Sequence, residues 1–245
     1  MFSKSQFKLI NSLSQKKYRY KHRLFVVEGI KAVSELLESD LELHSLFTTR
    51  DIFKAEKEKT FIIEESELRK ISNLITPQTS LAVFHMPEGH EPVLEGLVVA
   101  LDGVQDPGNL GTIIRMCDWF GISQLICSMG TVDCYNSKVV QATMGSIARV
   151  KIIYTSLPEL LGQVQPSIPV FGAFLEGENI YTHSLPAEGL IVMGNEASGI
   201  TPEVEALITT KLVIPQFGKE QNTESLNVAT ATAIFLSEFC RRQFY

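Results

Sequence analysis

The sequence predicts an α/β protein with two domains, each built on a sheet of strands covered by helices. At 245 residues, of which 44% are hydrophobic, the chain is long enough for two ordinary domains with their own cores. Short β-rich runs alternate with helical stretches along most of its length, a pattern typical of crossover connections. A stretch with two prolines and a glycine, residues 86–92, interrupts that alternation. We therefore expect domains at 1–88 and 96–245, joined by a linker at 89–95.

In the first domain, β-branched and aromatic runs indicate strands, and the stretches between them indicate helices. The expected strands are Leu24–Val27, Leu43–Thr48, Thr60–Ile63 and Ser80–Phe84, and the expected helices are Ile30–Leu37, Asp51–Lys57 and Ser66–Leu74. Because strands and helices alternate, this domain is expected to be an α/β sandwich.

The second domain alternates in the same way, with strands that are almost continuously apolar. The expected strands are Leu97–Leu101, Gln124–Cys127, Lys151–Tyr154, Val170–Phe174, Leu190–Met193 and Leu212–Ile214. Thr201-Pro202-Glu203 is a typical helix start, and Gly121 is a typical helix end. Apolar strands separated by helices predict a parallel sheet covered on both faces.

The first 23 residues differ in charge from the rest of the chain. The whole chain carries 22 basic and 28 acidic residues, yet residues 1–23 contain seven of the cations and no acid. Aromatic side chains (Phe2, Phe7, Tyr18 and Tyr20) interleave with these cations, as expected where rings stack on bases beside phosphate contacts. This start is therefore a candidate RNA-docking element, and the alternative is a solvated charged face. Its expected phosphate contacts are Lys16, Lys17, Arg19, Lys21 and Arg23.

Composition excludes several other classes of protein. No apolar run approaches the roughly 18 residues of a membrane helix, and the start lacks the apolar core of a secretory signal. The four cysteines form no C-x-x-C pair and the five histidines are scattered, so no metal site is expected. Such cysteines indicate a reduced, cytoplasmic protein. The basic start also fits an organellar targeting segment, although it runs directly into the strand that begins at Leu24.

Three glycine-containing loops follow expected strands of the second domain. They are residues 102–112, residues 194–199, and residues 215–218 with 225–228. Ligands of open parallel sheets bind at the carboxyl ends of the strands, and glycine lets the backbone approach a ligand closely. Each loop alone is also compatible with an ordinary turn, but three on one sheet favour a binding cleft. The chain contains neither a P-loop nor a G-x-G-x-x-G motif, which excludes the usual nucleotide and dinucleotide sites.

These loops resemble the three signatures of the SpoU (TrmH-like) RNA ribose 2′-O-methyltransferases. Residues 106–115 (DPGNLGTIIR) resemble the first signature, residues 194–199 (GNEASG) the second, and residues 214–218 (IPQFG) with 225–229 (SLNVA) the third. The segment from Asn136 to Ser146 also fits this family. The first domain resembles, more loosely, the L30e-like substrate-binding domain that many members carry.

The resemblance implies a SPOUT fold, in which the C-terminal part of a parallel sheet is threaded into a trefoil knot. It also implies a cytoplasmic homodimer that uses S-adenosylmethionine as methyl donor and acts on rRNA or tRNA, with no metal and no membrane. The implied catalytic residues are Asn109, Arg115, Glu196, Ser225 and Asn227. The implied methyl-donor contacts are Met193, Gly194, Ile214, Gly218 and Leu226.

Within that resemblance, Arg115 is expected to act as a cation, because a guanidinium with a pKa above about 12 is a poor base at neutral pH. The third signature departs from the family in its extra residues 219–224 and in Gln216-Phe217, which replace a methionine-centred pair. These departures leave open a non-catalytic RNA-binding or ribosome-assembly factor on the same fold. A third alternative is a small-molecule enzyme that uses the same cleft, but it does not account for the basic start.

Overall fold

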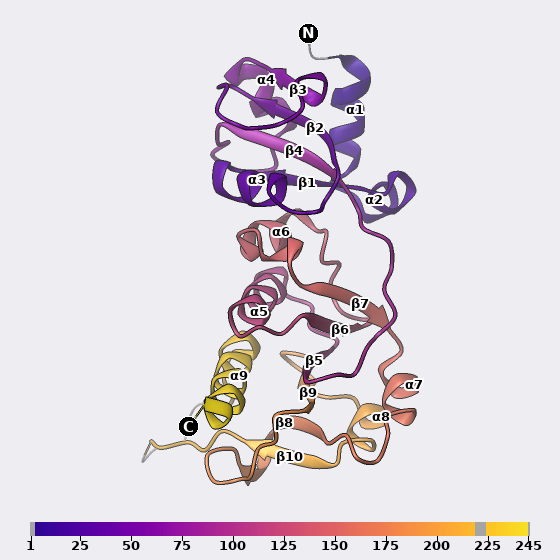
Figure 1. The fold of residues 1–245 in the computed structure, drawn as a ribbon, viewed down its shortest axis with the longest axis vertical. Helices are drawn as coiled ribbons and strands as arrows, with labels where there is room; N and C mark the ends of the chain where they lie inside the picture. Colours follow the sequence, from indigo (N-terminus) through magenta and orange to yellow (C-terminus); the bar gives the residue numbers. More distant parts are fainter. Residues whose placement is uncertain (1–2, 219–223, 245) are drawn as a thin grey trace. The chain divides into compact units, whose positions relative to one another are not determined.

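A computed structural model describes residues 3–218 and 224–244 (Figure 1). The chain forms two compact units. The first comprises Met1–Gly89 and Asp133–Arg149, and the second comprises His90–Val132 and Val150–Tyr245. The first crossing between the units adjoins the linker expected at 89–95. The segment 133–149, which the sequence places in the second domain, packs with the first unit.

The first unit is built on a four-stranded mixed sheet with strand order β1-β4-β2-β3. Its strands are β1 (Leu24–Glu28), β2 (Leu43–Thr48), β3 (Thr60–Ile62) and β4 (Ser80–His85). β4 is antiparallel to both β1 and β2, whereas β3 is parallel to β2. All four expected strands are therefore present, at nearly their predicted bounds.

Helices surround this sheet. They are α1 (Lys4–Ser12), α2 (Lys16–His22), α3 (Ile30–Leu37), α4 (Glu65–Ile71), α6 (Ser137–Thr143) and the 3-10 turns η1 (Lys57–Lys59) and η2 (Ser146–Ala148). The helix expected at Asp51–Lys57 is wrong. The Thr48 hydroxyl exchanges hydrogen bonds with the backbone of Arg50, which makes a turn at the end of β2 instead of a helix start.

The basic start folds into α1 and α2, which the sequence analysis did not anticipate. Ser3 and Gln6 form a reciprocal capping box at the start of α1. Phe7, Ile10 and Leu13, spaced three residues apart, face the core of the first unit. Phe7 is therefore a packing residue and is not available to stack on a base, while Phe2 lies outside the described residues.

The second unit is built on a six-stranded sheet with strand order β10-β8-β9-β5-β6-β7, in which every pairing is parallel (Figure 1). Its strands are β5 (Leu97–Asp102), β6 (Gln124–Ser128), β7 (Lys151–Thr155), β8 (Val170–Asn179), β9 (Gly189–Gly194) and β10 (Thr210–Val213). The predicted parallel α/β fold of this part is confirmed. Parallel strands place the three glycine loops at one edge of the sheet.

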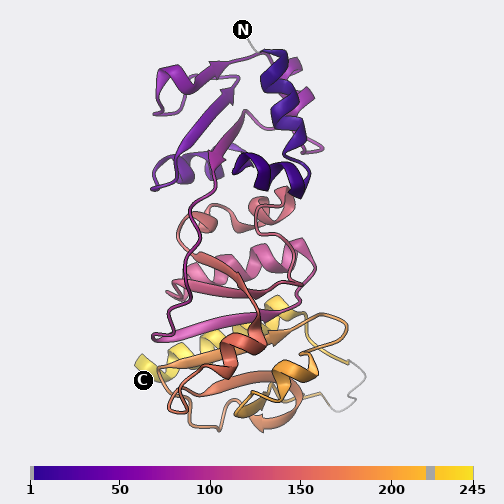
Figure 2. The same cartoon turned by 90° about the vertical axis from the view of Figure 1, so that its right-hand side faces the viewer.

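Helices cover both faces of this sheet. They are α5 (Pro107–Trp119), α7 (Leu157–Gly162), α8 (Pro202–Glu205) and α9 (Val228–Phe244). α7 and α8 pack on one face with Ala100 and Val192, and the long helix α9 packs beside α5 (Figure 2). Among the described residues, no helix is both long and apolar enough to cross a membrane.

Candidate active site

The first glycine loop leads from β5 directly into α5. The Asp106 side chain caps this helix by accepting a hydrogen bond from the Asn109 backbone amide at 2.8 Å, and Pro107 occupies the first turn of the helix. These two features begin the helix immediately after the loop. As a result, the Asn109 side chain lies in the first turn of α5, at the carboxyl edge of the sheet.

Three side chains from the three loops meet at this point. The Asn109 side-chain amide donates to the Glu196 carboxylate at 3.0 Å. The Asn227 side-chain amide in turn donates to Asn109 Oδ1 at 2.9 Å. Glu196 also accepts from the backbone amides of Gln105 and Asp106, each at 3.2 Å. We call Asn109, Glu196 and Asn227 the polar triad. It joins loops that are far apart in the sequence, as the three signatures predict.

The environment of Glu196 keeps it ionised. Partial burial raises its pKa, but hydrogen bonds from the Asn109 side chain and from nearby backbone amides outweigh burial, so the pKa of Glu196 lies below its ordinary value. A carboxylate that accepts several N–H donors is fixed in position. Glu196 is therefore suited to orienting its neighbours and poorly suited to acting as a proton donor near neutral pH.

The second glycine loop is a tight structure with little freedom. Asn195 and Gly199 form a small antiparallel bridge with backbone bonds of 2.9 and 3.0 Å. A side chain at Gly194 would lie 2.4 Å from the Gly199 carbonyl carbon, so only glycine fits there. Asn195 Oδ1 accepts from the amides of Ala197 and Ser198. The loop therefore carries Glu196 as one rigid piece.

The residues expected at the methyl donor lie around the ends of β9 and β10. Gly194 ends β9, and the half-buried Ile214 directly follows β10. Gly218 is exposed, and Leu226, which is 48% exposed, shortly precedes α9. Met193 is 1% exposed, so the described structure does not present it to a ligand. Partly exposed aliphatic side chains beside glycine backbone fit the apolar and polar parts of an adenosyl group. Of the extra residues 219–224, residues 219–223 lie outside the described part of the chain.

Comparison with known proteins identifies the family of this site. The profile of the SpoU rRNA Methylase family matches residues 96–237, and that of the MRM3-like substrate binding domain matches residues 4–82. The 23S rRNA (guanosine(2553)-2′-O)-methyltransferase RlmP of Bacillus subtilis (strain 168) is 30% identical over 230 residues, which cover 91% of each chain. The chain belongs to the SpoU rRNA methylase family.

Solved structures agree with this assignment. A putative RNA methyltransferase of the TrmH family from Porphyromonas gingivalis is 43% identical and superimposes with a TM-score of 0.91 over 99% of both chains. An AdoMet-bound rRNA methyltransferase from Sinorhizobium meliloti is 29% identical, with a TM-score of 0.84 over 100% of this chain and 98% of the other. The family that the motifs predicted is therefore confirmed.

Two of the catalytic residues expected in this SpoU family member do not join the polar triad. Arg115 lies six residues after Asn109 on α5, about 120° around the helix at 3.6 residues per turn. Its side chain is exposed, and no hydrogen bond or ion pair joins it to another described residue. Ser225 is also exposed and outside the triad. The spacing from Asn109 to Arg115, read as helical, already places them on different faces.

Trp119, one turn beyond Arg115 on the same face of α5, is 84% exposed. An apolar hollow with a volume of about 430 Å³ is lined by residues of α9, by Tyr181 and by Phe120, which directly follows Trp119. This SpoU protein therefore presents an exposed apolar side chain one turn from its candidate catalytic arginine.

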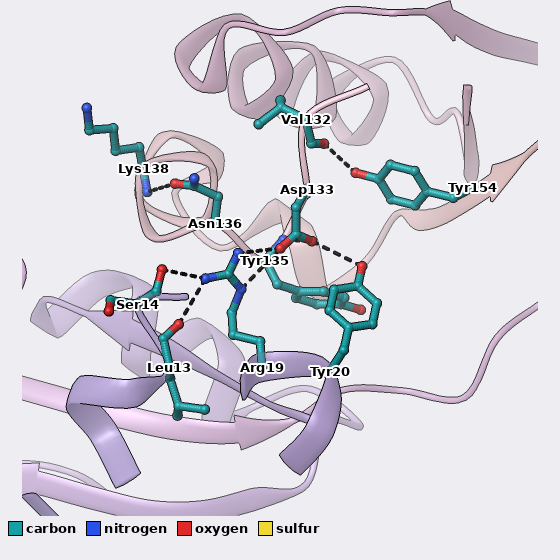
Figure 3. Close-up of polar contacts among 10 residues, drawn as sticks. All are labelled: Leu13, Ser14, Arg19, Tyr20, Val132, Asp133, Tyr135, Asn136, Lys138 and Tyr154. Carbon is teal, nitrogen blue, oxygen red and sulfur yellow. Dashed lines mark hydrogen bonds and ion pairs between the residues drawn. The ribbon is translucent and has the colours of Figure 1, made fainter. Parts of the chain in front are cut away.

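One cation of the basic start, Arg19, is not the exposed phosphate contact that the sequence predicted. Arg19 is 3% exposed, and within the first unit its guanidinium pairs with Asp133 at 2.5 Å and donates to the Leu13 and Ser14 carbonyls (Figure 3). It is a buried structural residue and is not available to RNA phosphate. Charge patterning alone does not reveal this, because the carboxylate partner lies 114 residues away.

The other basic residues of the start differ in availability. Lys16, Lys17 and Lys21 are exposed on α2, and the Lys16 ammonium lies 5.5 Å from the centre of the Tyr20 ring. Arg23 donates to the Pro87 carbonyl at 2.6 Å, which occupies part of its guanidinium. Lys17 and Lys21 are one turn apart, opposite the buried Arg19. α2 therefore keeps an exposed basic surface, made of Lys16, Lys17 and Lys21.

Among the described residues, no group of three or more histidine, cysteine or acidic side chains is arranged to hold a metal ion. Sequence reasoning missed the backbone amides of Gln105 and Asp106 that hold Glu196. It also missed Asp102 and Thr201, which join the first two loops by hydrogen bonds of 2.7 and 2.8 Å. An acid at the end of a buried strand, directly before a glycine, was the available signal.

Proposed function

We propose that this chain transfers the methyl group of S-adenosylmethionine to a ribose 2′-hydroxyl of ribosomal RNA. The observation that carries the proposal is the polar triad, which joins the three loops of the SpoU signatures at the carboxyl edge of a parallel sheet. The relative from Bacillus subtilis is named as a methyltransferase for a guanosine of 23S rRNA, which favours rRNA over tRNA.

When bound, the donor supplies an activated methyl group, so the residues of the chain need only position and polarise the acceptor. Ile214 and Leu226 would contact apolar parts of the donor, and the Gly194 and Gly218 backbones would approach its polar parts. Holding both reactants in line contributes on the order of 7–11 kcal/mol in favourable cases. No metal is required for this chemistry.

The chain's cations and amides would bind and polarise the ribose hydroxyl. Arg115, as a guanidinium, would grip an RNA phosphate and stabilise the oxyanion that develops on the 2′-oxygen, while the proton leaves to phosphate or water. Asn109 would hydrogen-bond the ribose, oriented by Glu196 and Asn227. Ser225, exposed before α9, would line the same pocket.

We also propose that the chain acts as a homodimer with the C-terminal knot of the SPOUT fold. An 84%-exposed tryptophan, followed in the chain by a residue that lines an apolar hollow, is unusual on a free surface and suits contact with a second copy. A partner packed against this face of α5 would surround Arg115, which finds no partner among the described residues of its own chain. A cytoplasmic location, where ribosomal RNA is accessible, follows from the proposed substrate.

We propose that RNA docks on the first unit through Lys16, Lys17 and Lys21, with Tyr20 beside them. Tyr20 is 42% exposed, and its hydroxyl donates to Asp133, which fixes the ring. The match of residues 4–82 to a substrate binding domain supports this placement. A non-catalytic RNA-binding factor would have no need of the intact polar triad, so we favour the enzyme.

The deciding experiment incubates the purified protein with labelled S-adenosylmethionine and rRNA from cells that lack the protein, followed by nucleoside analysis. We expect a 2′-O-methylated nucleoside. Arg115→Ala should lower kcat by at least 10²-fold, in the range typical of a lost oxyanion stabiliser, while calorimetry shows unchanged donor binding. An Arg115→Ala protein that keeps most of its rate would exclude the proposed role of this residue. Donor binding without methylation of any RNA would favour the non-catalytic alternative.

A further inference from the structure

The first two glycine loops are joined at three successive points. Asp102, at the end of β5, accepts from the Thr201 amide and hydroxyl at 2.7 and 2.8 Å. The Asn195 side-chain amide donates to the Gly103 carbonyl at 2.6 Å. The Glu196 carboxylate then accepts from the backbone at the start of α5. The attachments at Asn195 and Thr201 therefore hold the second loop at both of its ends. Glu196, which makes the third attachment, lies between them.

The attachment at Asp102 is shielded from solvent. Asp102 is 5% exposed, so its carboxylate cannot reach a substrate, and Thr201 donates to it from both its backbone amide and its hydroxyl. A buried carboxylate is tolerated only where donors satisfy it, and Thr201 supplies two donors. Asp102 therefore acts through Thr201.

The rigidity of the loop couples the position of Glu196 to that of Thr201. The bridge between Asn195 and Gly199, together with the lack of space for a side chain at Gly194, holds the loop in one conformation. A rigid loop that is released at one end pivots about the other. A shift at Thr201 would therefore move Glu196 relative to Asn109.

We propose that Asp102 is a positioning residue for methyl transfer: by holding Thr201 it places the Glu196 carboxylate against Asn109 and the start of α5. The proposal rests on the proposed function, in which Glu196 orients Asn109 toward the ribose. Misplacement of catalytic groups by about 1 Å lowers rates on the order of 10²-fold. The same loop would still bind donor through its backbone, so the effect is expected in kcat more than in KM.

The test uses Thr201→Val, which removes the hydroxyl donor and keeps the shape, with Thr201→Ser as the matched variant that keeps both donors. The first readout is the carboxyl titration of Glu196 by ¹³C NMR, assigned by its absence in Glu196→Gln. In the unaltered chain this pKa lies below the ordinary value. We expect the midpoint to rise in Thr201→Val, as the loop moves away from its donors, and to stay in place in Thr201→Ser.

The second readout is steady-state methylation of rRNA, normalised to donor-binding sites. We expect kcat to fall at least tenfold in Thr201→Val with the KM for RNA unchanged, and near-normal kcat in Thr201→Ser. A Thr201→Val protein that is merely less stable, with normal Glu196 titration and normal kcat per site, would overturn the proposal. If the unaltered chain methylates no RNA, the proposed function fails, and the NMR titration still decides whether the hydrogen bond from the Thr201 hydroxyl to Asp102 positions Glu196.

Discussion

Replacing Arg19 by methionine would remove the cation from a buried ion pair and leave its partner without charge compensation. Arg19 and Asp133 are 3% and 5% exposed. Four hydrogen bonds from the guanidinium disappear in this variant, two to Asp133 and two to the Leu13 and Ser14 carbonyls. Asp133 keeps the hydrogen bonds from the Tyr20 hydroxyl and the Tyr135 backbone amide, each at 3.2 Å.

The expected cost follows from this geometry. Breaking a buried pair by removing one partner costs about 3–5 kcal/mol, because an uncompensated charge stays buried. The double variant Arg19→Met, Asp133→Leu removes that charge as well, so it should be more stable than Arg19→Met alone. Lys17→Met, on the exposed face of the same helix, is the control and should change stability by no more than about 0.5 kcal/mol.

Hydrogen exchange of the amides in α2 and in residues 133–149, combined with urea unfolding, measures these differences within the first unit. The reasoning would be refuted by a loss of less than about 1 kcal/mol in Arg19→Met. It would also be refuted if the double variant were no more stable than the single one. Either result would mean that Arg19 is not the buried partner of Asp133.

Three further predictions concern the candidate site, the proposed RNA surface and the proposed dimer. Because the pKa of Glu196 is depressed in the folded chain, the stabilisation that its carboxylate gives the loops should be complete above the ordinary carboxyl pKa of about 4.3 and should be lost as pH falls through the lower folded value. Hydrogen exchange in residues 194–200 should show this loss, and Glu196→Gln should abolish the pH dependence. Charge reversal of Lys17 and Lys21 to glutamate should weaken RNA binding and flatten its salt dependence, whereas reversal of the exposed Lys54 and Lys57 should not; an unchanged salt slope would contradict the docking surface. Trp119→Asp should convert the proposed dimer to monomer in sedimentation experiments, and a dimer that persists would place the interface elsewhere.

The sequence predicted the strands well because their signal is local. Apolar runs such as Leu97–Leu101 are buried wherever the sheet forms, and all the expected strands are present. No helix forms at Asp51–Lys57, because the Thr48 hydroxyl binds the backbone of Arg50 and makes a turn directly before the segment. α1 and α2 were not predicted, because the charge pattern of residues 1–23 does not distinguish a helix from a loop; the local signals for α1 are the capping box at Ser3 and the apolar spacing that follows it.

The site was predictable to the extent that it depends on motif residues. Asn109, Glu196 and Asn227 meet as the three signatures imply, whereas Arg115 stays apart because a helix turns it to another face. Arg19 was misassigned because burial and pairing depend on the fold. A cation in a basic stretch looks the same in sequence whether it faces solvent or a distant aspartate.

The packing of residues 133–149 with the first unit limits how this protein can be divided or recombined. A fragment that starts at residue 96 would carry Asp133 without Arg19, and Tyr135 without Phe25, whose ring centre lies 4.8 Å away. Replacing only residues 1–89 by another substrate-binding domain would leave the same groups unmatched. A working chimera would therefore have to exchange two separate stretches of gene together, the first 89 codons and the 17 that encode Asp133–Arg149.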